Sequence, residues 1–598
     1  MSKALKDYVS NVEFINKMNS AFSDLRADYE LSMDVNQEKI AELVGTHVDV
    51  KNQLTDLISF SRSSSGVVSG LRGTGKTHLL LLARNKINQS CFDNDENSVF
   101  CAYLNIKRLA LPENCDQDLF NRIFSVYIYS ELSKQLSHVL ISFENETLIK
   151  KLLNRFNKDR RKLEKSLHDV ESKLVEFSAI ARNGNSEFKN LSIGTIGHES
   201  GTQSSSSSTV SFDAKVGMKD AAVGMGLSYE DIESISKRIA QNNTYLTYLN
   251  YTKVRDEIIS LLRMLGLKGI TFYIDEWEKI SYEPKLQEYL SFFIDRINDD
   301  PFYFWISVVP NRGGLYHLKI GADLQHLIDL DDSLVYENSS NERDLCLNYF
   351  QKFVDNRLKY YFGDEATDIK LFNNKNNFEK LVLASMGNSR DFGTMLLKCW
   401  SEFQSYRTSS LSPGRPFQYI SENMVISSIK NSGDKKKSNI QKDTATLNVL
   451  NDIETFCTTK KSSHFAVEES RSNIGYLARN EFSDLIYHRL IHLRKRYVPA
   501  KDTSTKNKLS IYALDYSSSY NLHSQEKRLR FITEYKDIHD KVRRYIYDPK
   551  QIVTRLQIEN GEVIPCPSCN EDINIIKMVA AWKNNYCPFC DGRIRNEN

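Results

Sequence analysis

The chain has 598 residues, which is enough for three or four domains that each bury a hydrophobic core. Its 79 lysines and arginines nearly balance 77 aspartates and glutamates, so the whole molecule is not a polycation built for nucleic acid, and any basic surface must be local. The N-terminus lacks an apolar signal segment, and no run approaches the ~18 apolar residues of a membrane span, so we expect a cytoplasmic protein without membrane contact.

An alternation of strand and helix patterns begins near residue 51. Residues 1–50 carry apolar side chains at three- and four-residue spacing, which predicts an N-terminal helical segment. Apolar strands are then expected just before the glycine-rich sequence GLRGTGKT and at 98–106, 269–274 and 302–309. This order predicts an α/β fold with a parallel sheet, in a nucleotide-binding core that spans 51–335.

An insertion separates the second and third predicted strands. Far more residues lie between Thr77 and Asp275 than the roughly 30 that a strand–helix–strand unit needs. The insertion, at about 140–235, begins with a charged segment of heptad-like spacing (146–182), which predicts a protruding coiled-coil-like hairpin. A serine-rich stretch follows, and it predicts a flexible loop or a small β-hairpin.

The glycine-rich sequence is a complete G-x-x-x-x-G-K-[ST] phosphate-binding motif between a strand and a helix. Glycines let backbone N–H groups surround phosphates at a helix N-terminus, Lys76 would reach the β- and γ-phosphates, and Thr77 would hold Mg²⁺. We therefore expect ATP and Mg²⁺ as cofactors. The predicted nucleotide contacts are Gly70, Leu71, Arg72, Gly73, Thr74, Gly75, Lys76, Thr77 and His78.

Two adjacent carboxylates end the third predicted strand. Asp275 would steady the Mg²⁺ ion, and Glu276 would orient or deprotonate the attacking water. Two acids at a strand end can also be a solvated turn, but their pairing with the phosphate motif favours the catalytic interpretation.

With these two motifs the chain resembles the AAA+ ATPases, in particular their initiator or origin-recognition-like branch and related bacterial defence ATPases. The resemblance covers about residues 40–430. The strand FYFWISVVPN would be the family's sensor 1 strand, which implies that Ser307 or Asn311 contacts the γ-phosphate or the water. The sequence MGNSRDFG (386–393) looks like the sensor 2 helix.

That resemblance also implies a helical lid and a site shared between subunits. Arg390 of the sensor 2 sequence would reach the nucleotide from a lid at 336–430. Arg312 is the candidate arginine finger for a neighbouring subunit, and the alternative for it is a solvated loop residue. The arginine-finger role implies a homo-oligomer.

The C-terminal third carries the local basic surface. Residues 431–550 hold 23 lysines and arginines against 15 acidic residues, and the lysine-rich stretch 433–443 predicts a linker. A predicted helix, a lysine-rich loop and two strands follow in an order that is typical of a winged-helix domain. The alternative is a basic helix face that only solvates the domain. Candidate phosphate contacts on the helix and wing are Arg489, Arg494, Lys495, Arg496, Lys506 and Lys508. His488 and His492 would share this helix as packing or phosphate-facing residues.

Two C-x₂-C knuckles, 17 residues apart, occupy the C-terminal segment 551–598. This spacing predicts a zinc ribbon in which four thiolates close a structural Zn²⁺ site. A pair of redox dithiols is the alternative. The predicted ligands are Cys566, Cys569, Cys587 and Cys590. We expect the other six cysteines, which lie among apolar neighbours, to be buried and reduced.

These features together predict an ATP-hydrolysing switch or assembly protein that acts with nucleic acid or a partner effector. Analogy to related ATPases favours bacterial anti-phage defence as its context. One alternative is a replication or transposition accessory ATPase that loads another enzyme onto DNA. The other alternative is a scaffold in which bound nucleotide is structural and is not hydrolysed.

Overall fold

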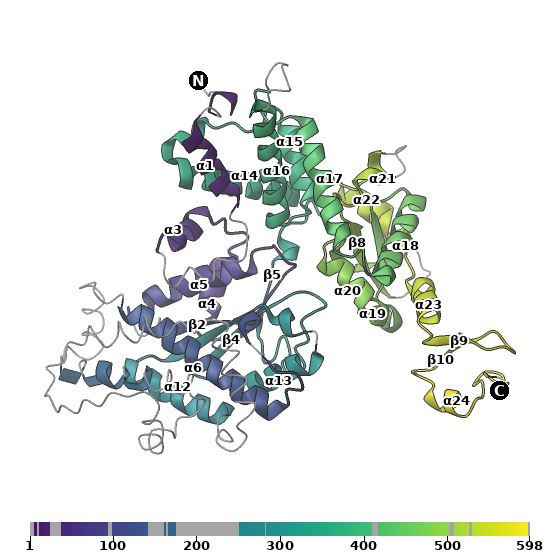
Figure 1. Ribbon diagram of the computed structural model, residues 1–598, viewed down its shortest axis with the longest axis horizontal. Coiled ribbons are helices and arrows are strands. Elements are labelled where there is room, and N and C mark those ends of the chain that lie inside the picture. Colours follow the sequence, from purple (N-terminus) through teal and green to yellow (C-terminus); the bar gives the residue numbers. More distant parts are fainter. Residues whose placement is uncertain are drawn as a thin grey trace, which may run out of the picture. The chain divides into compact units, whose positions relative to one another are not determined.

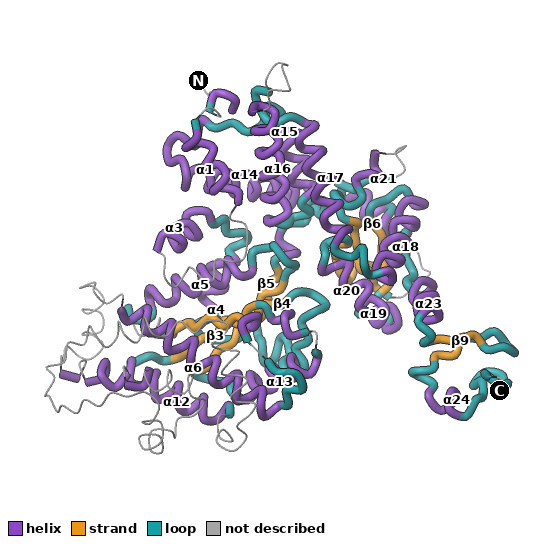
Figure 2. The backbone as a smooth tube through the Cα atoms, in the orientation of Figure 1, coloured by secondary structure: helices purple, strands orange, loops and turns teal. Residues whose placement is uncertain are grey.

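The structure is a computed structural model, drawn as a ribbon in Figure 1 and as a tube coloured by secondary structure in Figure 2. It describes residues 5–8, 11–23, 37–93, 98–109, 111–141, 161–162, 165–170, 172–174, 250–281, 283–408, 417–501, 507–524 and 529–595. Apart from a few short stretches, the predicted insertion at about 140–235 lies outside these residues, and so does Lys506.

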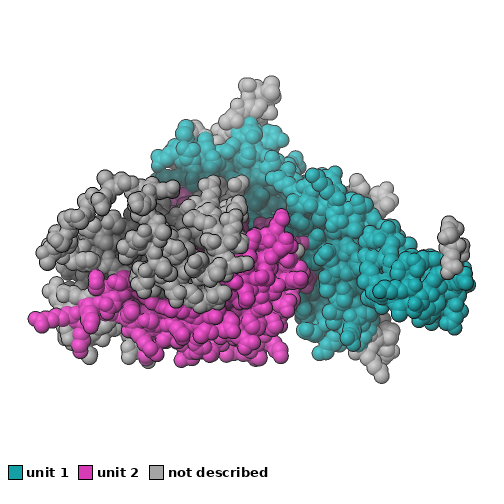
Figure 3. All heavy atoms as spheres, turned by 60° about the horizontal axis from the view of Figure 1, so that its bottom comes forward, with its two compact units in different colours: residues 1–23, 334–351, 365–598 teal, residues 24–333, 352–364 magenta. Residues whose placement is uncertain are grey.

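The chain divides into two compact units, which Figure 3 colours separately. Unit 1 comprises Met1–Ser23, Leu334–Gln351 and Glu365–Asn598, and unit 2 comprises Asp24–Ser333 and Lys352–Asp364. Each unit is described by itself below.

Unit 2 is built on a parallel five-stranded sheet with the strand order β2-β3-β4-β1-β5. The strands are β1 (Gly66–Ser69), β2 (Val99–Asn105), β3 (Gly269–Asp275), β4 (Phe302–Val308) and β5 (His326–Asp329). The first four strands confirm those expected from the sequence, and the parallel sheet confirms the predicted α/β fold. Because all five strands run the same way, their carboxyl ends meet at one edge of the sheet.

Helices cover both faces of this sheet (Figure 1). One face packs on α3 (Gln37–Thr46), α4 (Gln53–Phe60) and α5 (Lys76–Ser90), and the other packs on α6 (Gln117–Ile141), α12 (Tyr251–Leu265) and α13 (Pro284–Asp295). Alternate residues of a strand face opposite sides, so both faces must be apolar. The burial of all seven residues of β2 and β3 follows from this arrangement. Short 3₁₀ helices lie at Ile106–Arg108, Trp277–Ile280 and Asp331–Ser333.

The first part of unit 1 is helical and includes most of the segment 336–430, for which the sequence predicts a helical lid. Its helices are α1 (Val12–Ser23), α14 (Ser340–Phe362), whose C-terminal part belongs to unit 2, α15 (Lys375–Ala384), α16 (Ser389–Thr408) and α17 (Glu422–Ser438). The N-terminal helix α1 packs on α16, where Trp400 Nε1 donates to Asn19 Oδ1 at 2.9 Å and its ring lies 6.2 Å from that of Phe14. Residues 1–50 are therefore divided between the units, with α1 in unit 1 and α3 in unit 2. Two more 3₁₀ helices lie at Leu5–Asp7 and Gly363–Asp368.

The predicted linker at 433–443 is wrong, because α17 continues through its first half to Ser438. Gly433 faces a turn of the C-terminal domain so closely that a Cβ atom there would lie 2.1 Å from Ser517 O. Three residues further on, the Lys436 side chain is buried and lies 2.7 Å from Asp515 Oδ1. The lysine run is thus part of a packed helix, with its middle ammonium group inside the unit.

The C-terminal domain has the helix and strand order of a winged-helix domain. Its elements are α18 (Thr444–Lys460), β6 (His464–Glu468), α19 (Arg471–Leu477), α20 (Asn480–Tyr487), β7 (Ile491–Pro499) and β8 (Lys508–Leu514). The three strands form an antiparallel sheet in the order β6-β8-β7. The segment 529–547, with α22 (Tyr535–Asp540) and the 3₁₀ helix Val542–Arg544, packs apolar side chains on this sheet.

The sequence-based helix around His492 is wrong. Helix α20 ends at Tyr487, and Arg494 and its neighbours lie on strand β7 instead. His488 and His492 therefore do not share a helix face. Apolar and polar residues alternate only from Ile491 to Arg494, a short stretch of period two that favours a strand. The elements that complete unit 1 are α21 (Tyr520–Ser524), α23 (Lys550–Glu559), the antiparallel pair β9 (Val563–Pro565) and β10 (Asp572–Asn574), and α24 (Val579–Lys583).

Substituting Gly433→Ala should test whether α17 packs as described. The new methyl group has no room beside Ser517 O, so we expect the free energy of unfolding to fall by about 1–3 kcal/mol. Gly475→Ala in α19 is the matched control, because nothing lies within 4 Å of a Cβ there, and it should stabilise by up to about 1 kcal/mol. Urea denaturation followed by circular dichroism measures both. Equal effects of the two substitutions would contradict the packing of α17.

Candidate functional site

The phosphate-binding motif forms the connection between β1 and α5. Gly73 and Gly75 have φ angles of 90° and 100°, a left-handed backbone that favours glycine at both positions. Lys76 is the first residue of α5, and its buried Nζ donates to Gly70 O at 2.6 Å and Leu71 O at 3.1 Å. The lysine ammonium group thus lies over the loop, at a helix N-terminus where anions are stabilised.

A carboxylate that follows β5 holds the start of this loop. The Leu71 N–H donates to both oxygens of Asp331, at 3.1 and 3.0 Å. Burial, followed by the charge of Asp329, raises the pKa of Asp331 to about 6. β5 pairs with β1, so this contact fixes the loop relative to the edge of the sheet.

Asp275 joins the phosphate loop to the acidic strand. Its Oδ2 accepts from Thr77 Oγ1 at 2.6 Å and from Tyr103 OH at 2.8 Å. Asp275 is itself 1% exposed, at the carboxyl end of β3. The two residues that the sequence assigned to Mg²⁺ are therefore within hydrogen-bond distance of each other. This suits one ion that is bound directly by the Thr77 hydroxyl and steadied by the Asp275 carboxylate.

Two further carboxylates follow Asp275. Glu276 has a left-handed backbone with φ 59°, which is strained for a residue with a side chain and recurs at functional sites. Glu278 is 7% exposed, and burial, opposed by Lys76, raises its pKa. Burial lowers the pKa of Lys76, and the carboxylate of Glu278, ahead of those of Asp275, Asp331 and Glu276, acts against this shift. Glu278 is thus the strongest electrostatic partner of the loop lysine.

Strand β4 lies between β1 and β3 and brings Ser307 into the same edge. Ser307 is 0% exposed and pairs in register with Val68 of β1. Within the part of the chain that the structure describes, Ser307 Oγ and one oxygen of Glu278 are buried without a hydrogen-bond partner. Oε2 of Glu276 is also buried without a hydrogen bond, and Lys279 Nζ lies 3.6 Å from it. Buried polar atoms of this kind call for a ligand, an ion or water. Together with the glycine-rich loop and the Thr77–Asp275 pair, these buried polar atoms fit a nucleoside triphosphate with Mg²⁺.

Three other predicted site residues lie outside this cluster, two in the loop after β4 and one in unit 1. Asn311 is exposed in the loop after β4, with φ 65°. Arg312 is half-buried in the same loop, and Gln287 Nε2 donates to Arg312 O at 3.0 Å and to Trp277 O at 3.1 Å, which ties this loop to the acidic segment. Arg390 is half-buried at the start of α16 in unit 1, and its contact with the nucleotide stays a prediction.

His78, predicted as a nucleotide contact, meets a second histidine. Its Nε2 lies 3.1 Å from Nδ1 of His47, and the two rings stack with centroids 5.2 Å apart. Burial, and then the charges of His47 and Arg357, lower the pKa of His78 to about 3, so its ring is neutral at physiological pH. In the structure, His78 on α5 therefore packs on His47, which follows α3, beside the phosphate loop.

Three site residues were missed by the sequence analysis. Tyr103 lies inside an apolar strand, where nothing marks its hydroxyl as polar and functional. Asp331 follows a short strand, β5, which the sequence did not reveal. Glu278 stands two residues beyond the recognised acidic pair, and its spacing alone could have suggested a third carboxylate.

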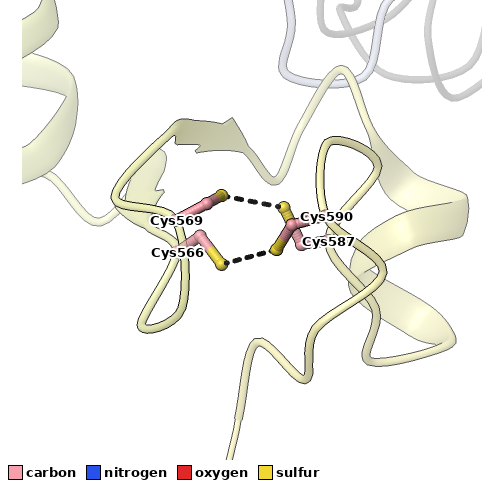
Figure 4. A group of neighbouring side chains, drawn as sticks. All are labelled: Cys566, Cys569, Cys587 and Cys590. Atoms are coloured by element: carbon pink, nitrogen blue, oxygen red, sulfur yellow. Dashed lines mark hydrogen bonds between the residues drawn. The ribbon is translucent and has the colours of Figure 1, made fainter.

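Four cysteine sulfurs converge at the C-terminus (Figure 4). The Sγ atoms of Cys566 and Cys590, and those of Cys569 and Cys587, are 3.7 Å apart, and all four lie within 4.8 Å of one another. A tetrahedral ion with metal–sulfur bonds of ~2.3 Å sets its sulfurs ~3.8 Å apart. The cluster can therefore hold a tetrahedral metal ion. The other six cysteines are buried free thiols, as expected.

The candidate nucleic-acid contacts fall into two groups. Arg489 and Arg494 are held by carboxylates inside unit 1, which corrects their assignment to a phosphate-facing helix. Arg496 and Lys508 are exposed at the wing ends of β7 and β8, and Lys495 is half-buried. No helix in the described part of the chain is long and apolar enough to span a membrane.

No protein-family model matches the chain, and no curated protein is similar to it in sequence. Among solved structures, the ORC1 protein of Aeropyrum pernix, in complex with DNA, is similar over 81% of this chain and 96% of its own chain, with 11% identity and a TM-score of 0.31. A likeness of this size does not extend to function, which has to follow from the geometry of the chain itself.

The cysteine cluster should bind one zinc ion per chain. Elemental analysis of the purified protein is expected to find this ratio, and Cys590→Ser should lower it because one of four ligands is lost. Cys457→Ser removes a buried thiol elsewhere and should leave the zinc content unchanged. Protein that stays free of zinc after reconstitution with Zn²⁺ under reducing conditions would contradict a zinc ribbon.

Proposed function

We propose that the protein is a Mg²⁺-dependent ATPase of the AAA+ type that works as a switch or in assembly. The observation that carries this proposal is the hydrogen bond from Thr77 of the phosphate loop to Asp275 at the end of the acidic strand, at 2.6 Å. It joins the two halves that an ATP site needs, a cradle for phosphates and a carboxylate for the metal.

Binding would rest on the loop and the first turn of α5. Backbone N–H groups of the left-handed glycines and the Lys76 ammonium group would take the phosphates, and Lys76 would exchange its contacts with the loop carbonyls for phosphate oxygens. Thr77 and Asp275 would hold Mg²⁺, which supplies charge neutralisation at the β- and γ-phosphates. Tyr103 would keep the Asp275 carboxylate oriented.

Hydrolysis would need a carboxylate to orient the attacking water. Glu276 directly follows Asp275, the proposed Mg²⁺ residue. Its left-handed backbone is strained, as is common for residues at functional sites. Glu278 is the second candidate, because it is more deeply buried and is the main electrostatic partner of Lys76. Ser307, which lies between them and the loop strand, would donate its hydroxyl to the γ-phosphate or the water.

A partner subunit and the lid would complete the site. Arg312 from a neighbouring copy and Arg390 from the lid are the predicted cations for the γ-phosphate, so ATP would favour a homo-oligomer. Bacterial defence, with an effector protein, remains the proposed context on the strength of the family resemblance. A loader for replication or transposition enzymes is the alternative. A non-hydrolysing scaffold would be preferred if removing both carboxylates changed nothing.

Nucleic acid is the proposed ligand of the wing. Tyr497 is 59% exposed and lies under Lys508, whose Nζ is 5.7 Å from the ring centroid, and Lys495 Nζ lies 4.7 Å from the ring of Tyr535. Exposed rings beside cations suit stacking on bases and contact with phosphates. Helix α20 (Asn480–Tyr487) contains no lysine or arginine, so the wing is favoured over this helix as the contact.

ATP turnover should separate the roles of loop and carboxylates. Lys76→Ala is expected to weaken ATP binding about 10- to 100-fold, since hydrogen bonds to charged groups contribute about 1.5–3 kcal/mol. Glu276→Gln should bind ATP normally and turn over about 10²- to 10⁴-fold more slowly. Glu278→Gln, measured in parallel, decides which carboxylate orients the water, and exposed Glu288→Gln is the control. Unchanged turnover in both Glu276→Gln and Glu278→Gln would reject hydrolysis at this site.

Nucleic-acid binding should depend on the wing. Arg496→Gln and Lys508→Gln should each reduce the slope of log affinity against log salt by about 1, because each removes one phosphate contact. Tyr497→Ala should weaken single-stranded more than double-stranded binding. Fluorescence anisotropy with labelled oligonucleotides measures these effects, and Lys39→Gln in unit 2 is the control for loss of a cation outside the wing. Binding that is absent in the unmodified protein, or equal in all variants, would count against the wing.

A further inference from the structure

A tryptophan separates the two carboxylates that are candidates for orienting the attacking water. Trp277 lies between Glu276 and Glu278 in the acidic segment (residues 275–280) and begins the 3₁₀ helix Trp277–Ile280. Its ring is buried, and its Nε1 donates to Gly314 O at 3.2 Å, in the first part of the loop after β4 (residues 309–317, the β4 loop). Whatever fixes Trp277 therefore also fixes the main chain from which both carboxylates project.

Gln287 of α13 binds both the acidic segment and the β4 loop. Its Nε2 donates to Trp277 O at 3.1 Å and to Arg312 O at 3.0 Å, and its Oε1 accepts from the Gly314 N–H at 3.3 Å. A glutamine amide has two N–H donors and one carbonyl oxygen, so both donors and the acceptor are used. The side chain is only 3% exposed, which keeps water from competing for these hydrogen bonds.

The β4 loop depends on such contacts because its backbone is strained. Asn311 and Tyr316 have φ angles of 65° and 43°, a left-handed conformation that costs free energy in residues with a side chain. Gly313 packs so closely on β4 that a Cβ atom there would lie 2.9 Å from Val308 Cβ. A strained backbone persists only where surrounding groups hold it, so the contacts of this loop decide its arrangement.

A second side chain of α13 holds the far part of the β4 loop. Ser291, one helical turn after Gln287, is buried. Its Oγ donates to Leu315 O at 2.7 Å and accepts from the His317 N–H at 2.9 Å. Both of these hydrogen bonds go to the loop, whereas Gln287 also reaches the acidic segment.

Binding of ATP and Mg²⁺ would use a different set of contacts. Thr77 and Tyr103 hold Asp275, and Lys76 lies at the phosphate loop. Hydrolysis, by contrast, needs a carboxylate that is placed accurately beside the attacking water, because a displacement of about 1 Å can lower the rate about 100-fold. The contacts of Gln287 act on this second requirement.

We propose that Gln287 is a positioning residue for ATP hydrolysis. Its amide holds Trp277 against the β4 loop, and the carboxylates on either side of Trp277 thereby keep one placement toward the phosphate loop. Whichever of Glu276 and Glu278 orients the water, its position depends on Gln287. This role rests on the proposed ATPase function, and all the residues that produce it belong to unit 2.

Kinetics and ATP binding of Gln287→Met test the proposal in the full chain. Methionine has a similar length and no N–H donor in its side chain, so we expect kcat to fall about 10- to 100-fold, with little change in the Kd of ATP measured by calorimetry. Ser291→Ala is the matched control, because it removes contacts with the same loop from the same helix, and it should keep most of kcat. The carboxyl of Gln287→Glu can donate only when it is protonated, so the activity of this variant relative to the unmodified protein should rise as the pH falls.

Hydrogen exchange of the nucleotide-free protein gives a second measurement that does not need turnover. The N–H groups of Lys279 and Ser281 donate to Glu276 O and Glu278 O, so their exchange reports on the acidic segment. We expect both to exchange faster in Gln287→Met than in Ser291→Ala, with the exchange of α5 unchanged.

Three results would overturn the role of Gln287. These are an unchanged kcat in Gln287→Met, a Kd of ATP that rises as much as kcat falls, and unaltered exchange at Lys279 and Ser281. An unmodified protein that does not turn over ATP would instead reject the proposed ATPase function, and the exchange of Gln287→Met would still decide whether Gln287 holds the acidic segment.

Discussion

The candidate site depends on the two hydrogen bonds that Asp275 accepts from Thr77 and Tyr103. A parallel sheet places the ends of its strands at one edge, and these hydrogen bonds join the glycine loop to the acidic strand there. Strand β4 separates β1 from β3, so the carboxylate reaches across its end, where Ser307 lies buried. A wrong register of any of these strands would separate the groups, because a shift by one residue turns each side chain to the opposite face.

The two units differ in how their buried charged side chains are neutralised. At the sheet edge, Asp275, Glu276 and Glu278 gather near a single buried lysine, Lys76, an arrangement suited to a ligand that brings both phosphates and a cation. In unit 1, by contrast, carboxylates and cations neutralise one another inside the protein. The lysine run of α17 shows the difference, because Lys436 is buried between Asp391 and Asp515 and is withdrawn from any external partner. The excess of basic residues in the C-terminal third therefore overstates its basic surface.

Local patterns predicted those parts of the fold that depend on neighbouring residues. The phosphate loop, the strands at 98–106, 269–274 and 302–309, and the four-cysteine cluster all follow from short motifs or apolar runs. Contacts between distant segments were beyond reach. Asp331 meets Leu71 only because β5 pairs with β1, and Lys436 looked like part of a linker because its partners Asp391 and Asp515 are remote in sequence. Likewise the sequence suggested that Arg494 is a cation on a helix surface, whereas it lies on strand β7 and is paired with the buried Glu337.

Calorimetric titration of the purified protein with ATP, with and without Mg²⁺, tests the central claim most directly. If Thr77 and Asp275 hold the metal beside the phosphate loop, ATP should bind at one site per chain, and removal of Mg²⁺ should weaken that binding. Asp275→Asn should lose most of the Mg²⁺ dependence and still bind nucleotide through the loop. An absence of ATP binding at millimolar concentration, or binding that Mg²⁺ and Asp275→Asn leave unchanged, would contradict the account.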